Sequence, residues 1–184
     1  MTSGARAARA RPSERSLLEA VAAALAERGY RTYVDPDGGD YFDLAVRRGD
    51  EVGLVEGKLG DASAVLGQAL RRRAWADWVA VALGSPRAAS RLVARTSGRR
   101  AAVVGVWAVE GGIARELRPA VPAPPPPPDD PFAGPRRRFR QALDDLDRGT
   151  LDPSVRWSGV PSAVRRSSAG RKFAEWRLDE PGSP

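Results

Sequence analysis

The sequence predicts an α/β protein in which a mixed β-sheet is flanked by helices. Three observations support this prediction: two apolar runs have the length of buried strands, segments of helical periodicity separate them, and shorter strand-like segments come before them. The apolar runs lie at 78–83 and 102–109. The resulting order of helix, three strands, helix, strand, helix and further strands is that of a mixed sheet with helices on both faces.

A first helix is expected to begin after Ser13, a good N-cap residue, and to end at Gly29. Its apolar residues recur at helical spacing and form one stripe, Leu17, Leu18, Val21 and Leu25. Glu14 falls on this stripe, and a carboxylate there is unusual, so we expect it to point into the same cavity as Asp43. Alternatively, Glu14 only stabilises the positive end of the helix dipole.

Three strands are expected next, at 30–34, 41–46 and 51–59, with a loop at 35–40 and a hairpin turn at 47–50. Side chains of the third strand alternate between two faces. One face carries Val52, Leu54, Glu56 and Lys58, and the other carries Gly53, Val55, Gly57 and Leu59. The two glycines on the second face predict that another element packs closely there.

The rest of the sheet alternates helices with strands. A helix at 62–73 carries Gln68 near the edge of its apolar face, and the buried strand 78–83 follows it. Ser85 and Pro86 suit the cap and first turn of a third helix that extends to Thr96. The buried strand 102–109, a turn at 110–112 and a strand at 113–117 complete the sheet.

The chain is divided into four parts by composition. Residues 1–12 are expected to be a disordered basic arm, and residues 13–121 to be one domain that folds by itself. The segment 122–135 contains five consecutive prolines and is expected to be an extended linker. The basic tail 136–184 has one short helix, at 136–148, and is otherwise irregular. Such a tail could bind nucleic acid by charge and stacking, or a protein partner.

Composition excludes several classes of enzyme. The chain has no cysteine and no histidine, so neither thiolate chemistry nor a Ser-His-Asp triad is available. Any general base must be a carboxylate, a lysine or a tyrosine. Any metal site must consist of oxygen ligands, which suits Mg²⁺ or Mn²⁺.

Charge and hydropathy indicate the surroundings of the protein. A net charge of +7 favours a polyanionic partner such as DNA, although basic charge alone is weak evidence. No stretch approaches the length of a membrane span, and no signal-peptide pattern is present at the start. With no cysteine, the chain suits a reducing compartment, so we expect a cytoplasmic protein without a membrane partner.

The most informative position is Lys58, one of only two lysines beside 28 arginines. A position that keeps lysine can need a compact point charge that a guanidinium does not provide. Glu56 and Lys58 lie two residues apart on a predicted strand and share a face, and Asp43 stands on the strand before it. We expect the carboxylates of Asp43 and Glu56 to share one cation, with the Lys58 ammonium beside them. Chance retention of one lysine is the alternative.

These residues resemble the PD-(D/E)xK nuclease superfamily, which has the restriction-endonuclease-like fold. The resemblance covers 14–83: Glu14 on the first helix, Phe42-Asp43 entering a strand, Glu56-Gly57-Lys58 on the next strand, and Gln68 on the following helix. It is nearest in appearance to small endonucleases of the Holliday-junction-resolvase type. The sequence has Phe42 where the superfamily usually has proline, and Gly57 where an apolar residue is usual.

The resemblance implies a role for each residue. Asp43 and Glu56 would bind Mg²⁺ or Mn²⁺, and Glu14 would complete or support the metal site. Lys58 would orient the attacking water or stabilise charge in the transition state. Gln68 would position Lys58 or the phosphate. The arginines at 47–48, 71–73 and 99–100 would be natural phosphate contacts, or simply solvated surface.

The sequence leaves two hypotheses about function. The first is a Mg²⁺-dependent DNA endonuclease in repair, recombination or defence, which could act as a homodimer when it cuts both strands. The second is a non-catalytic DNA-binding or assembly module that has kept the nuclease fold. Intact Asp43, Glu56 and Lys58 favour the first hypothesis.

Overall fold

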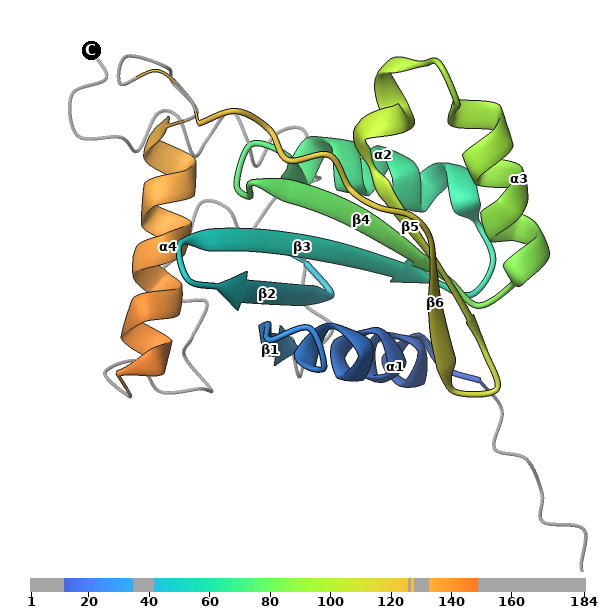
Figure 1. The fold of residues 1–184 in the computed structure, drawn as a ribbon, viewed down its shortest axis with the longest axis horizontal. Coiled ribbons are helices and arrows are strands. Elements are labelled where there is room, and N and C mark those ends of the chain that lie inside the picture. Colours follow the sequence, from blue (N-terminus) through green and yellow to red (C-terminus); the bar gives the residue numbers. More distant parts are fainter. Residues whose placement is uncertain (1–11, 35–41, 126, 128–132, 149–184) are drawn as a thin grey trace, which may run out of the picture.

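A six-stranded mixed sheet forms the centre of the protein (Figure 1). The computed structural model describes residues 12–34, 42–125, 127 and 133–148. Outside these ranges lie the predicted basic arm up to residue 11, the predicted loop 35–40 with residue 41, residues 126 and 128–132 of the predicted linker, and the tail from residue 149. The strands are β1 (Arg31–Val34), β2 (Leu44–Arg48), β3 (Glu51–Lys58), β4 (Trp78–Leu83), β5 (Gly105–Glu110) and β6 (Ile113–Arg118), and they lie in this order across the sheet.

The pairing of the strands follows from their connections. Short connections join antiparallel neighbours: β1 with β2, β2 with β3, and β5 with β6. The helices α2 (Ala62–Arg72) and α3 (Pro86–Thr96) connect the parallel pairs β3–β4 and β4–β5. Because parallel crossovers are right-handed and the strands advance in one direction, both helices lie on the same face. The predicted order of helices and strands is therefore confirmed.

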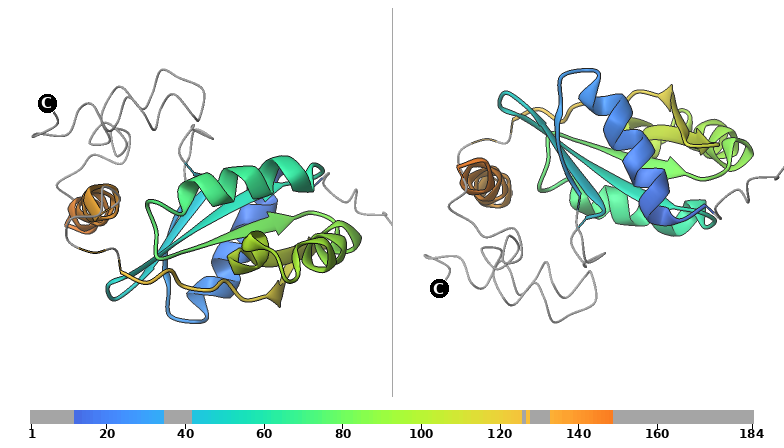
Figure 2. Two further views of the ribbon diagram at one scale, coloured as in Figure 1. Left: turned by 90° about the horizontal axis from the view of Figure 1, so that it is seen from above. Right: turned by 90° about the horizontal axis from the view of Figure 1, so that it is seen from below.

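Helices cover both faces of the sheet, as expected (Figure 2). The helix α1 (Glu14–Ala26) packs its buried residues against one face, where Leu44, Val55 and Trp107 belong to the same apolar cluster. The helices α2 and α3 cover the other face, where Leu54 and Val81 belong to a second cluster. The sheet thus has an apolar core on each side, which explains why all six residues of β4 are buried.

The two glycines of β3 allow close packing on the α1 side. A Cβ atom at Gly57 would lie 2.9 Å from Leu18 Cδ2 and 3.0 Å from Leu17 Cδ2 of α1. A Cβ atom at Gly53 would lie 2.2 Å from Cζ2 of the Trp78 indole ring. The prediction that another element approaches this face closely is confirmed, and it explains the small residue between Glu56 and Lys58.

We expect Gly53→Ala to destabilise the protein more than Gly57→Ala. The obstacle at Gly53 is a rigid indole, so the substitution should cost about 1–3 kcal/mol, the range for overpacked cores. The obstacles at Gly57 are the ends of two leucine side chains, which can rotate away. Urea unfolding of the two variants measures the difference, and equal losses would show that the indole yields as easily as the leucines.

Some predicted boundaries differ from the structure. Arg47 and Arg48 belong to β2 rather than to the turn, because the hairpin needs only Gly49, with φ of +59°, and Asp50. The apolar segment at 102 does not begin a strand. Residues Arg100–Val103 form a 3₁₀ turn, and β5 begins at Gly105, where pairing with Ala80 starts.

The largest difference concerns the segment after the proline run. The helix α4 (Ala133–Asp147) begins inside the predicted linker, and it packs onto the domain instead of standing apart from it. Phe139 is buried and meets Phe42 edge-on at 5.5 Å between ring centroids, and Leu143 is fully buried. Residues 13–121 are therefore in contact with α4, and their folding without this helix stays a prediction.

Ion pairs fix α4 at the ends of the strands. Arg140 Nη2 donates to both carboxylate oxygens of Asp77, at 2.7 and 2.8 Å, and Asp77 also accepts from the Val52 amide. Arg47 pairs with Asp144, and the Tyr33 hydroxyl donates to Asp147 at 2.7 Å.

None of the helices in the described part of the chain is long and apolar enough to cross a membrane.

Candidate active site

Asp43, Glu56 and Lys58 come together where β2 begins and β3 ends. Leu44 pairs with Val55, so Asp43, one residue before β2, stands beside Glu56. Opposed residues of antiparallel strands point to the same face, which here is the face covered by α2. Burial is the largest cause of the raised pKa of Glu56, and the charges of Asp43 and Lys58 also act on it, in opposite directions, so all three groups interact.

Asp43 is held by the backbone of β3. Its Oδ2 accepts a hydrogen bond of 2.7 Å from the Gly57 amide, which lies between the two other residues of the site. Burial raises the pKa of Asp43, and the hydrogen bond from Gly57 opposes this rise. The hydrogen bond therefore fixes the position of the carboxylate but only partly compensates for the hydration that its charge loses on burial.

Glu56 is the most buried member of the site, with 2 % of its surface exposed. Its Oε1 accepts from Arg72 Nε of α2 at 3.1 Å. Burial nevertheless raises the pKa of Glu56 to about 7, because the loss of hydration outweighs the attraction of the Arg72 guanidinium. A second positive charge nearby would favour the ionised form.

The raised pKa of Glu56 predicts a pH dependence of stability. The native state keeps this proton between pH 4.5, the ordinary pKa, and about pH 7, whereas the unfolded state releases it. Without metal ions, stability should therefore fall as pH rises through this window, by about 3 kcal/mol at 1.36 kcal/mol per unit. Urea unfolding at pH 5 and pH 8 measures the fall.

The matched control is Glu56→Gln, which cannot titrate and keeps an oxygen for Arg72. The difference between pH 5 and pH 8 should be smaller in this variant than in the wild type. An identical difference in both proteins would show that Glu56 does not titrate in this window.

Lys58 lies at the rim of the site and pairs with α1. Its Nζ donates to Glu14 Oε2 at 2.9 Å, and this hydrogen bond raises the pKa of Lys58. The amine is therefore protonated at neutral pH and acts as a point charge rather than as a base.

Glu14 lies at the edge of the site. Burial is the largest cause of the raised pKa of Asp43, and the charge of Glu14 also raises it. The Glu14 side chain is 46 % exposed, so it does not belong to the buried stripe of α1. It is connected to the candidate site through its ion pair with Lys58. Glu14 also stands in the first turn of α1, where the dipole favours it. Its carboxylate faces the Lys58 ammonium, and the prediction that it is a metal ligand finds no support in this contact.

Gln68 and Arg72 lie one turn apart on the same face of α2. Gln68 Oε1 is buried and has no hydrogen-bond partner among the described residues. Arg72, in contrast, reaches Glu56 directly. Arg72 was predicted only as one of the arginines at 71–73 that would contact phosphate or lie at the surface, and not as a partner of Glu56. Its spacing of four from Gln68 is the sequence signal that could have indicated it.

The donor set of the site is compatible with Mg²⁺. Among the described residues, no three carboxylate, imidazole or thiol side chains lie close enough together to hold a metal ion. Mg²⁺ does not need three, because it is commonly bound by one or two carboxylates together with water and substrate oxygens. Asp43 and Glu56, both with raised pKa values, fit such a site.

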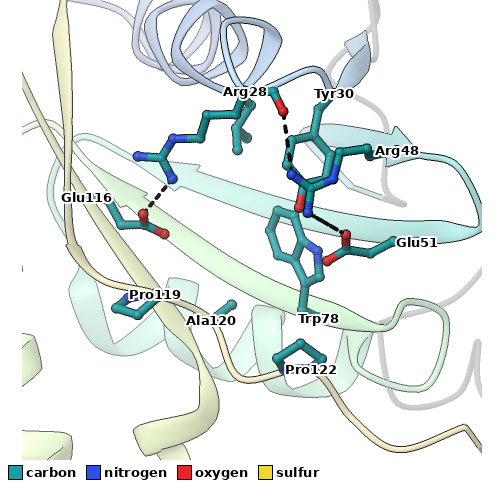
Figure 3. A pocket seen from close by; sticks show the side chains of 10 residues that line it. Arg28, Tyr30, Arg48, Glu51, Trp78, Glu116, Pro119, Ala120 and Pro122 are labelled. Carbon is teal, nitrogen blue, oxygen red and sulfur yellow. Dashed lines mark hydrogen bonds and ion pairs between the residues drawn. The ribbon is translucent and has the colours of Figure 1, made fainter.

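A separate pocket of about 230 Å³ lies at the other end of β3, where Glu51 is the first residue (Figure 3). Tyr30 and Trp78 meet edge-on in its wall. Its two arginines are both paired, Arg28 with Glu116 and Arg48 with Glu51. This pocket therefore offers no uncompensated charge and does not include any residue of the candidate site.

Comparison with protein-family models, with curated proteins and with solved structures gives no match for this chain. What the structure defines is an α/β protein with a six-stranded mixed sheet flanked by helices. The resemblance to the PD-(D/E)xK superfamily rests on Glu14, Asp43, Glu56, Lys58 and Gln68.

Proposed function

We propose that this protein is a Mg²⁺-dependent nuclease of the restriction-endonuclease-like fold that hydrolyses phosphodiester bonds in DNA. The observation that carries the proposal is the placing of two desolvated carboxylates, Asp43 and Glu56, beside a protonated lysine at one end of the sheet. Carboxylates in such surroundings are costly to ionise without a nearby positive charge, so they are suited to binding a cation.

Each residue has a distinct part in the proposed chemistry. Asp43 and Glu56 would bind the divalent ion, which neutralises charge on the phosphate and lowers the pKa of bound water. Lys58, fixed by Glu14, would hold its positive charge at the reacting phosphate or the attacking water. Gln68 has a buried oxygen that would accept a hydrogen bond from water or from Lys58.

A polyanionic substrate agrees with the charge of the chain. The net charge is +7, and Arg71, Arg99 and Arg100 are exposed on the surface. Arg47 and Arg48 are less suitable phosphate contacts than the sequence suggested, because both pair with carboxylates. DNA in a repair, recombination or defence process is the substrate that we propose.

The alternative is a DNA-binding or assembly module without catalytic activity. One observation favours this alternative: Lys58 is paired with Glu14, and Glu56 is paired with Arg72. In a module without catalytic activity, these ion pairs would be permanent. A module of this kind would bind DNA with the same affinity whether or not a divalent ion is present.

The two functions are separated by incubating the protein with plasmid, branched-junction and single-stranded DNA, with and without Mn²⁺. The nuclease should cleave at least one of these substrates only when the ion is present, and Asp43→Asn should bind that substrate without cleaving it. DNA binding without cleavage by the wild type under every condition would support the non-catalytic module.

A further inference from the structure

Arg72 forms an ion pair with Glu56 in a part of the site that is largely closed to water. Its Nε lies 3.1 Å from Glu56 Oε1, and the two side chains are 11 % and 3 % exposed. Of the carboxylates in the described part of the chain, Glu56 alone is buried. The pair therefore joins the last residue of α2 to the centre of the candidate site.

The guanidinium of Arg72 is held on the helix side of the site. Its central carbon lies 5.3 Å from the centroid of the Trp75 ring, so a cation–π contact supports it independently of Glu56. Because of this contact with Trp75, Arg72 can leave Glu56 without becoming an isolated charge. The other cation of the site, Lys58, pairs with Glu14 instead of Glu56.

We propose that Arg72 is an internal counter-ion that occupies Glu56 until a divalent cation binds, so that Arg72 and the metal ion compete for this carboxylate. The proposal rests on the proposed function, because it assumes that Glu56 is a metal ligand. Two charges of the same sign repel strongly at short distance in a site shielded from water. A divalent ion on Glu56 must therefore weaken or displace the contact with Arg72.

Competition and a purely structural role of Arg72 predict opposite effects of its loss on the affinity for a metal ion. If Arg72 only held α2 against β3, its loss would weaken the site and the binding of any metal ion. If Arg72 competes, its loss should strengthen metal binding. The sign of the change in affinity therefore separates the two roles.

The test is a calorimetric titration of the full-length protein with Mn²⁺ at one fixed pH near 8. Arg72→Gln removes the charge and keeps a hydrogen-bond donor, and it should bind Mn²⁺ at least about tenfold more tightly than the wild type. Arg72→Lys keeps the charge and should resemble the wild type. Arg71→Gln is the matched control, because it removes the same charge from an exposed position of the same helix and should change little.

Each outcome has a definite meaning. Equal or weaker Mn²⁺ binding by Arg72→Gln, with binding by the wild type intact, would overturn the competition and leave the proposed function standing. No binding by the wild type or by any variant would overturn both. Tighter binding by Arg71→Gln as well would show a general effect of net charge and would also overturn the competition.

A second measurement covers the case in which Arg72→Gln does not fold. The Nε–H signal of Arg72 can be followed by NMR in the wild type during addition of diamagnetic Mg²⁺, and it can be assigned from its absence in Arg72→Lys. We expect this signal to shift and its proton to exchange faster with water as Mg²⁺ binds. An unchanged signal at saturating Mg²⁺ would contradict the proposal.

Discussion

A chain that ends at Pro125 is expected to lose much of its stability, because it lacks α4. Phe139 and Leu143 fill one core cluster together with Phe42 and Leu54, and loss of a single buried phenylalanine side chain typically costs about 3–5 kcal/mol. The truncation also leaves Asp77 without Arg140, whose Nη2 donates to both of its carboxylate oxygens. Urea unfolding should show a lower midpoint or no cooperative transition.

The control is a chain that ends at Arg148, which removes only residues that the structure does not describe. It should unfold at nearly the same urea concentration as the full-length protein. Phe139→Ala tests the same contact in the full-length chain and should reproduce much of the loss. If both shortened chains unfold at the same midpoint, then α4 is a tethered element, as the proline run suggests.

Lys58→Arg is expected to reduce DNA cleavage by roughly two or more orders of magnitude, the usual effect of losing a positioned catalytic group. Stability should change little, because the Lys58 side chain is one-third exposed and arginine can keep the ion pair with Glu14. What the variant loses is a compact charge, since the guanidinium is planar and larger. Single-turnover cleavage rates with Mn²⁺ measure the effect.

The only other lysine, Lys172, provides the matched control. Lys172→Arg should cleave DNA at the rate of the wild type. Wild-type activity in Lys58→Arg, measured beside this control, would show that lysine at position 58 was retained by chance.

Much of the fold could be predicted from the sequence because local patterns determine it. Apolar runs marked β4 and most of β5, and Ser85-Pro86 marked the start of α3. The docking of α4 could not be predicted in the same way. It depends on Phe42 and Asp77, which are far from Phe139 and Arg140 in the sequence. The proline run alone indicated separation, because composition describes a segment without its partners.

The candidate site could likewise be predicted only in part. Strand alternation was sufficient to place the two glycines of β3 on the face of α1 and Glu56 on the opposite face, beside α2. It did not indicate that Lys58, at the end of β3, reaches Glu14 of α1. The contact between Arg72 and Glu56 depends on where α2 lies over β3, which no local pattern determines. Glu14 shows the limit of helical periodicity: it falls on the apolar stripe, but its side chain is half-exposed and reaches Lys58 at the rim of the site.

Cleavage of DNA by Glu56→Gln tests the central claim most directly, with Glu110→Gln as control. Glu110 is exposed at the end of β5, so its substitution removes the same charge away from the candidate site. With Mn²⁺ present, the wild type and Glu110→Gln should cleave DNA at equal rates, whereas Glu56→Gln should stay folded and show no cleavage above background. Equal cleavage by all three proteins, or by none, would contradict a nuclease site built on Glu56.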